Sequence, residues 1–350
     1  MEVELSRKVP GFVVDPAMVF AYPTRLSDVY APAVEQIYLP EEAFPDLEFT
    51  IRVSSRDTGP RQSSSFRSKA YSRLQRLWFG AQTLDFSGQF VFDTRFDTDQ
   101  NPSHVIDGVL VPILYAKRVL SEYSGQDVEI HIILRKRASK LARQAYETLG
   151  IPIICTEENV FGNVVDISTL EIYNTIPQTF DIDIGGYNPD TPEKIFIPRR
   201  GNRSIINNDE VVGFLEERGF VTYYFEELTP SQQWSIVRNA KTVVAVHGAA
   251  CGHLSFNRLG LESPDIPGSG LRILEIFSPT FVLTWRRRHA KVLNGRWCGV
   301  RGQITPESLR ALDFKDWGDS VSPHESPMKD PFKVDLSTIQ MALDHLEANP

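Results

Sequence analysis

The sequence has few cysteines, no long apolar run and no excess of positive charge. Its three cysteines, Cys155, Cys251 and Cys298, lie far apart and match no metal-ligand spacing. We therefore expect buried free thiols in a reducing compartment, not disulfides or a zinc site. The chain has no apolar run of the roughly 18 residues that a membrane-spanning helix needs. Its 37 basic and 45 acidic residues give a net charge of −8, which disfavours nucleic acid and anionic membranes as partners.

Two kinds of short signal are also missing. The N-terminal MEVELSRKVPGF has no apolar stretch of the kind that a secretory signal contains. A cytoplasmic location is therefore expected; the alternative is the secretory-pathway lumen, if an anchor has been removed. Neither G-x-G-x-x-G nor a Walker A sequence occurs, so dinucleotide oxidoreduction and P-loop hydrolysis lose their main support.

Length and composition are those of a globular protein with two domains. The 350 residues are 41% hydrophobic and 23% charged, and domains of about 100–200 residues are usual. An Asp-, Asn- and Pro-rich connector at 181–193 marks a boundary. We expect an N-terminal domain over 1–180, with 1–90 irregular and β-rich, then a second domain over 194–330 and a C-terminal helix over 331–350.

Hydrophobic spacing predicts alternating strands and helices on both sides of this connector. In the first part we expect a helix over 103–121, which Pro112 kinks or starts, followed by a strand, a helix and a strand at 128–134, 138–150 and 151–155. The alternating run 84–94 predicts a strand pair that turns near Gly88.

The second part repeats this pattern. Expected strands lie at 194–198, 221–225, 242–246 and 271–276, with helices that begin near Asn207, Thr229 and Asp335. Such alternation is typical of an α/β protein with two doubly wound parallel sheets.

The buried strand 242–246 runs directly into His247, Gly248, Ala249 and Ala250. A glycine turn and a short helix at the carboxyl end of a strand present backbone N–H groups that favour a phosphate. A plain tight turn is the alternative.

Three arginines, Arg199, Arg200 and Arg203, follow the strand 194–198. Ligands bind at the carboxyl ends of strands in open α/β sheets, and guanidinium groups match phosphate oxygens. We expect a diphosphate site here; a solvated loop is the alternative.

His104 and Asp107 are three residues apart at the start of a predicted helix, where they would share a face. A carboxylate beside an imidazole suits a general base for a hydroxyl, although a cap or surface pair would have the same spacing. Two D-x-D tripeptides, 97–99 and 181–183, allow a weak hypothesis of Mg²⁺ or Mn²⁺ binding. The acid-free basic segments 58–84 and 276–306 are exposed surfaces or walls of an anion site.

Several of these motifs, in this order, resemble glycosyltransferase family 61. The resemblance is strongest over 194–279, through IFIPRR, VVAVHGAACGHLSF and LEIFSP, and extends upstream to Asn101, His104, Asp107 and Pro112. One departure is Ala250-Cys251-Gly252, which replaces the family's usual Gly-Leu-Thr type of continuation. We find no such resemblance over 1–90.

The resemblance implies a GT-B-like architecture, in which two Rossmann-like domains face a cleft. It implies an inverting glycosyltransferase that moves a sugar from a nucleotide sugar to a hydroxyl of a glycan acceptor, without an essential metal. The donor would be a UDP-sugar such as UDP-xylose or UDP-GlcNAc. The N-terminal domain would bind the acceptor and the second domain the donor.

Each candidate site residue then has an expected role. The donor would contact the three arginines, the backbone of Gly248, Ala249 and Ala250, and Glu275 through its ribose. His104 or Asp107 would be the general base, with His247 as a competing base or a phosphate ligand. Two other functions stay open: a sugar-nucleotide epimerase of GT-B type, and a non-catalytic carbohydrate-binding protein.

Overall fold

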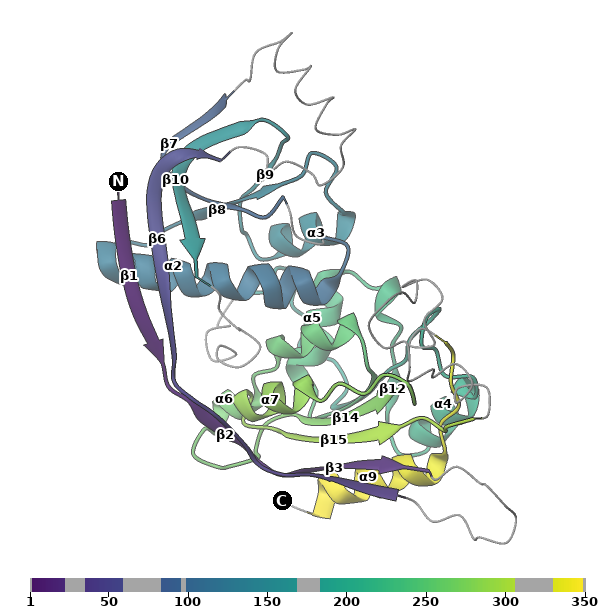
Figure 1. Cartoon of the computed structure of the whole chain (residues 1–350). Helices are drawn as coiled ribbons and strands as arrows, with labels where there is room; N and C mark the ends of the chain where they lie inside the picture. The colour runs from purple at the N-terminus through teal and green to yellow at the C-terminus, as the bar shows by residue number, and fades with distance from the viewer. Residues whose placement is uncertain are drawn as a thin grey trace, which may run out of the picture. The chain divides into compact units, whose positions relative to one another are not determined.

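The computed structural model describes residues 2–22, 35–58, 83–95, 99–168, 183–305 and 330–348. The chain divides into two compact units, Met1–Pro10 with Asp46–Gly186, and Gly11–Pro45 with Tyr187–Pro350 (Figure 1). The second boundary lies inside the predicted connector. Residues 11–45, in contrast, belong to the second unit and not to the N-terminal domain in which we placed them. None of the described helices is both long and apolar enough to cross a bilayer.

The first unit is built on a mixed sheet. Its strands lie in the order β1 (Glu2–Val9), β6 (Leu47–Thr58), β10 (Asn159–Ile167), β7 (Thr83–Asp93), β8 (Ile130–Leu134) and β9 (Ile153–Cys155). β7, β8 and β9 are parallel, as the strand–helix alternation predicts. β6 pairs antiparallel with β1 and with β10, so the prediction of a wholly parallel, doubly wound sheet is wrong for this unit.

Two local predictions need correction or refinement here. Residues 84–94 do not form a strand pair: β7 is one continuous strand, and Gly88 takes a left-handed φ of 83° without ending it. The predicted helix 103–121 is a π-helix, η1 (His104–Leu110), followed by α2 (Val111–Ser124). Pro112 is the second residue of α2, which continues directly from η1, and Pro112 has no N–H to donate to the preceding turn. Pro112 therefore marks the start of the α-helix.

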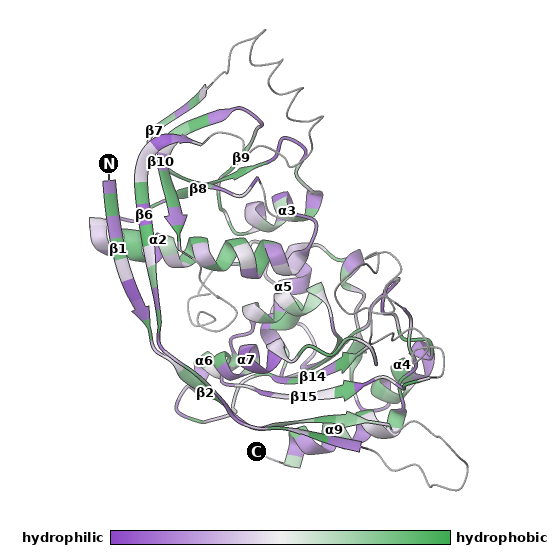
Figure 2. Cartoon of the chain, viewed as in Figure 1, coloured by the Kyte–Doolittle hydropathy of each residue, from purple (hydrophilic) through white to green (hydrophobic). Residues whose placement is uncertain are grey.

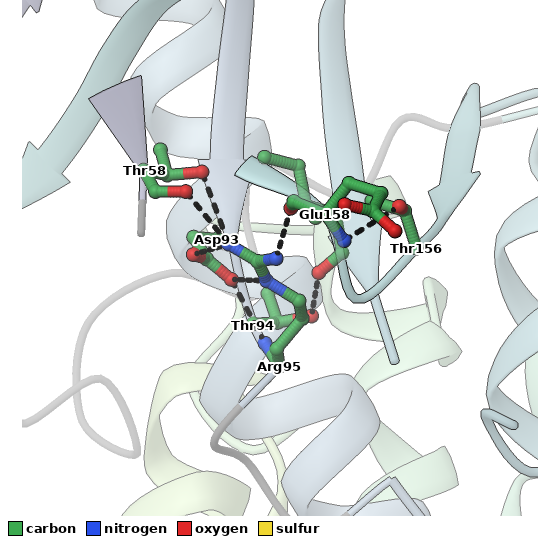
Figure 3. A network of polar contacts seen from close by, with 7 residues as sticks. Thr58, Asp93, Thr94, Arg95, Thr156 and Glu158 are labelled. Atoms are coloured by element: carbon green, nitrogen blue, oxygen red, sulfur yellow. Dashed lines mark hydrogen bonds and ion pairs between the residues drawn. The ribbon is translucent and has the colours of Figure 1, made fainter. Parts of the chain in front are cut away.

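A buried arginine ties strand ends of the first unit together. The side chain of Arg95 is 2% exposed. It donates hydrogen bonds to both carboxylate oxygens of Asp93 and to the backbone carbonyls of Thr58 and Glu158 (Figure 3). Because the charge is paired and its donors are satisfied, we assign Arg95 a structural role.

The second unit has a seven-stranded sheet. The order is β12 (Val221–Thr222), β11 (Lys194–Ile197), β13 (Thr242–Val246), β14 (Arg272–Phe277), β15 (Arg296–Arg301), β3 (Ala17–Ala21) and β4 (Glu35–Leu39). All neighbours are parallel except β3 and β4. The predicted strand 221–225 is shorter than expected, because η4 (Phe225–Glu227) begins within it.

Helices cover both faces of this sheet. α5 (Pro230–Asn239) and α7 (Trp285–Val292) share one apolar cluster with the strands, and α4 (Asn208–Glu216) and α9 (Leu336–Ala348) share the other. Strands buried on both faces are expected to be apolar throughout, and Figure 2 shows β3 and β14 mostly in the hydrophobic colour. The second unit therefore has the doubly wound architecture predicted for it, and the C-terminal helix packs on its sheet.

The basic segment after β14 explains why residues 11–45 belong to this unit. Arg287 of α7 donates to the backbone carbonyls of Asp15 and Pro40. Arg288 forms an ion pair with Glu42 at 2.7 Å. These contacts, together with the pairing of β3 and β15, fix the early strands on the second sheet. Arg287 and Arg288 thus hold residues 11–45 on the second sheet, a role that we did not expect for the basic segment.

Candidate functional site

The candidate site lies where the chain direction across the second sheet reverses. After β11 the chain moves to β12 at the edge, whereas β13, β14 and β15 follow on the other side of β11. In open α/β sheets, ligands bind outside the carboxyl ends of the strands at such a switch point. Because β11 and β13 are adjacent and parallel, the segments that follow them emerge side by side. The two sequence motifs predicted to hold a phosphate are thereby brought together.

Arg199 and Gly248 are in direct contact at this edge. Arg199 Nη1 donates to the backbone carbonyl of His247 at 3.3 Å. A Cβ atom on Gly248 would lie 2.2 Å from the same nitrogen. Gly248 has an extended φ of 170°, so the reason for glycine is this close approach and not backbone strain. Burial lowers the pKa of Arg199, yet the group stays charged at neutral pH.

Arg203 is the second half-buried guanidinium at this edge. It lies over the ring of Phe281 at 4.8 Å and takes a left-handed φ of 60°, a conformation that costs about 1–2 kcal/mol outside glycine. Burial and the neighbouring charge of Arg199 lower the pKa of Arg203 to about 10. Among the described residues, neither arginine has a carboxylate partner. An anion placed here would offset both the desolvation and the mutual repulsion.

Arg200 differs from these two arginines. It is exposed, pairs with Glu227 and stacks over the ring of Tyr224 at 4.0 Å. Its pKa is raised by the hydrogen bond to Glu227. The predicted set of three arginines therefore splits, since the structure brings only Arg199 and Arg203 to the glycine turn.

His247 is held by a buried carboxylate. Its Nδ1 donates to Glu275 Oε1 at 2.6 Å, and Trp297 Nε1 donates to Glu275 Oε2 at 2.9 Å. Glu275 is 0% exposed, and both its oxygens are occupied. The prediction that it contacts a ribose is therefore wrong; Glu275 orients the imidazole. The bond at Nδ1 leaves Nε2 as the nitrogen available to a ligand.

Backbone N–H groups complete this edge. Ala249 and Ala250 begin η5 (Ala249–Phe256), and both are half-buried. The first N–H groups of a helix have no partner within it and attract anions. Cys251 follows them in the core, and burial raises the pKa of its thiol to about 12, so it is not a nucleophile. Cys251 and Cys298 are buried as predicted, but Cys155 is exposed.

His104 and Asp107 do not present one face to a ligand. His104 is exposed, whereas Asp107 is buried and accepts a hydrogen bond from Ser103 Oγ at 2.6 Å. The predicted shared face assumes an α-helix. Here the two residues lie in the π-helix η1, which has more residues per turn and so separates positions i and i+3.

The acidic tripeptides give no metal cluster in the described ranges. Asp99 is used within the first unit, because its carboxylate accepts hydrogen bonds from Arg135 and from the backbone N–H of Ser139. Asp183 is exposed. Asp97 and Asp181 lie outside the described residues, as does nearly all of the basic segment 58–84. No group of three His, Cys, Asp or Glu side chains in the described part could hold a cation.

Sequence reasoning missed two aromatic residues: Phe281, which lies at this site, and Trp297, which supports it only through Glu275. Phe281 faces both the Arg203 guanidinium and the His247 ring, with centroids of the two rings 5.4 Å apart. It follows β14 at the same sheet edge, so the rule that identified the arginines could have identified it. Trp297 lies within β15 and contacts Glu275 across the sheet; no local signal marks it.

Comparison with known families identifies a match over much of the chain. The model of the family described as Glycosyltransferase 61 matches residues 60–261, more than half of the sequence. The match includes Arg199, Arg203, His247 and Gly248. It begins at residue 60, so our expectation of no resemblance over 1–90 is wrong for 60–90, and it ends before Glu275. No curated protein matches the sequence.

Proposed function

The chain belongs to glycosyltransferase family 61 and is a glycosyltransferase, and from this premise we propose a donor, a mechanism and the residues involved. The donor is a nucleoside diphosphate sugar, namely a UDP-sugar such as UDP-xylose or UDP-GlcNAc. It binds at the carboxyl edge of the second sheet. A glycan hydroxyl attacks the anomeric carbon in a single displacement, with inversion. The units act in a GT-B arrangement, with the acceptor on the first.

The main observation that supports this proposal is that Arg199 and Arg203 lie at the same sheet edge as Gly248. Sugar transfer leaves a nucleoside diphosphate on which negative charge develops as the glycosidic bond breaks. Fixed cations in a desolvated site stabilise that charge without reorganising. Two half-buried guanidinium groups with no carboxylate partner among the described residues meet this need, and the N–H groups of Ala249 and Ala250 add to it. The proposal therefore requires no metal ion.

His247 would contact the diphosphate through Nε2. Its neighbour is Arg199, which donates to the His247 carbonyl, so the imidazole belongs to the same edge as the cations. Glu275 fixes the ring and stabilises a proton on it as the leaving group departs.

The general base would come from the first unit. Of the two candidates, His104 is exposed and Asp107 is buried with a hydrogen bond from Ser103. A base must reach the acceptor hydroxyl, so exposure favours His104, while Asp107 holds the start of η1.

Calorimetric titration with UDP, GDP and CMP tests the donor site. We expect UDP to bind the wild-type protein, and Arg199→Ala to weaken it with Arg200→Ala as a charge-matched control. His104→Ala should lower sugar transfer and leave UDP affinity unchanged. If none of the three nucleotides binds, or if both arginine variants bind UDP as the wild type does, the proposed donor site is wrong.

A further inference from the structure

The second unit has a cavity at the amino-terminal edge of its sheet, away from the edge that carries Gly248. Its volume is about 360 Å³, and its wall includes the starts of β3 and β15 and residues of α7 and α9. The proposed donor site uses the carboxyl ends of the strands. This cavity is therefore not part of that site.

The cavity wall is positively charged. Arg287, Lys291 and Arg296 line it, and Asp15 is the one acidic residue of the lining. Asp15 is paired with Lys291 at 2.8 Å. The two guanidinium groups have no carboxylate partner among the described residues, so a net positive charge faces the cavity. Such a wall favours an anionic ligand.

Arg296 has unused hydrogen-bond donors. Its guanidinium makes no hydrogen bond or ion pair with another described residue, and Nη1 is buried without an acceptor. The group lies flat against Gly268, where a Cβ would be 2.5 Å from Nε. Gly268 thus allows the backbone to approach the guanidinium closely. The side chain of Arg296 is half-buried and forms no ion pair among the described residues, so an anion in the cavity would offset the desolvation of its charge.

The other walls are fixed and partly apolar. Trp297 is held by its hydrogen bond to Glu275, and Arg287 by the carbonyls of Asp15 and Pro40. Pro16 and Pro267, both exposed, add apolar surface. Burial and the charge of Arg296 lower the pKa of His345, so this lining residue is neutral at neutral pH. A preformed cavity with apolar walls and one polar group that lacks a partner is typical of a small-molecule site.

We propose that this cavity binds a small organic anion, a phosphate monoester or a carboxylate with a flat apolar body. The anionic group contacts Arg296, and the apolar body packs on the exposed rings of Pro16 and Pro267. Phosphate monoesters and carboxylates share the chemistry that a guanidinium recognises, and the probes below separate them.

Calorimetry with phenyl phosphate, benzoate and benzyl alcohol tests the proposal. We expect the wild-type protein to bind at least one of the two anions at millimolar concentration, and the neutral alcohol at least about tenfold more weakly, since a charge-assisted contact is lost. Stronger binding of phenyl phosphate or of benzoate identifies the anionic group.

Three charge-removing variants locate the site. Arg296→Gln and Lys291→Gln should each weaken binding of the preferred anion, the first by about tenfold or more. Arg203→Gln, at the opposite edge, should leave this affinity unchanged and weaken UDP binding. Because Arg296 makes no hydrogen bond or ion pair with another described residue, its variant should unfold close to the wild-type temperature, and Lys291→Gln gives a second test. Absence of binding by the wild type, equal binding of the alcohol, or sensitivity to Arg203→Gln alone would overturn the proposal.

Discussion

Two groups of arginines in the second unit show how the same side chain serves opposite purposes. Arg287 and Arg288 of α7 are matched by internal partners: backbone carbonyls for the first and Glu42 for the second. Arg199 and Arg203 after β11 are half-buried but have no carboxylate partner in the described ranges. In the first group the protein itself neutralises or satisfies the cation, which stabilises the fold. In the second group, as we propose, the positive charge serves to bind a ligand.

The comparison teaches that local charge density does not identify an anion site. The α7 segment is as basic as the segment after β11. Its partners lie more than 240 residues earlier in the chain, where no sequence pattern connects them. What distinguishes a binding site is a desolvated cation whose charge and donors the fold leaves largely unmatched.

The largest expected effect is on stability. Arg287→Ala should lower the free energy of unfolding by about 3 kcal/mol, because one buried hydrogen bond to Val14 and partly buried hydrogen bonds to Asp15 and Pro40 are lost together. Urea denaturation measures this. Arg288→Ala is the matched control, since its ion pair is partly exposed and should contribute at most about 1 kcal/mol. Equal losses of unfolding free energy for both variants would contradict the assigned role of Arg287 in holding residues 11–45 on the sheet.

Removal of Arg199 or Arg203 should have the reverse pattern. Arg199→Ala and Arg203→Ala should each weaken UDP binding by about tenfold or more, because a charge-assisted hydrogen bond to phosphate is lost. The free energy of unfolding should stay within about 0.5 kcal/mol of the wild type, since no ion pair is broken. Calorimetry and urea denaturation on the same samples separate the two effects. A large loss of stability with unchanged UDP affinity would mean that these two arginines stabilise the fold, as Arg287 and Arg288 do.

Gly248→Ala should act on UDP binding through Arg199. The added Cβ would overlap Arg199 Nη1, so the guanidinium must move, and we expect affinity to fall by roughly threefold. If the effect is indirect, the double variant Gly248→Ala/Arg199→Ala should bind UDP no more weakly than Arg199→Ala alone. Additive losses would show that Gly248 acts by another route.

Arg200→Ala should have the smallest effect. Its guanidinium is exposed and paired with Glu227, and such surface pairs contribute little because solvent screens them. We expect UDP affinity to change by less than about twofold. A loss as large as that of Arg199→Ala would restore the original prediction of a three-arginine site.

Much of the second unit could be predicted from sequence because its signals are local. The apolar run 242–246 identifies a strand buried on both faces, and Thr229 with Gln232 identifies a capping box that the structure contains. The first unit was less predictable. The pairing of β1 with β6 and of β6 with β10 joins distant segments whose alternating patterns do not name a partner.

The sequence by itself determined the alternation of strands and helices, the glycine turn after β13 and the family to which the chain belongs. Each depends on residues close together along the chain or on an ordered set of motifs. Only the tertiary structure decided that Arg200 pairs with Glu227 away from the glycine turn and that Glu275 holds His247. It also decided that a π-helix separates His104 from Asp107. These outcomes depend on burial and on which distant groups meet, because a side chain's free energy in the fold is set by its neighbours in space.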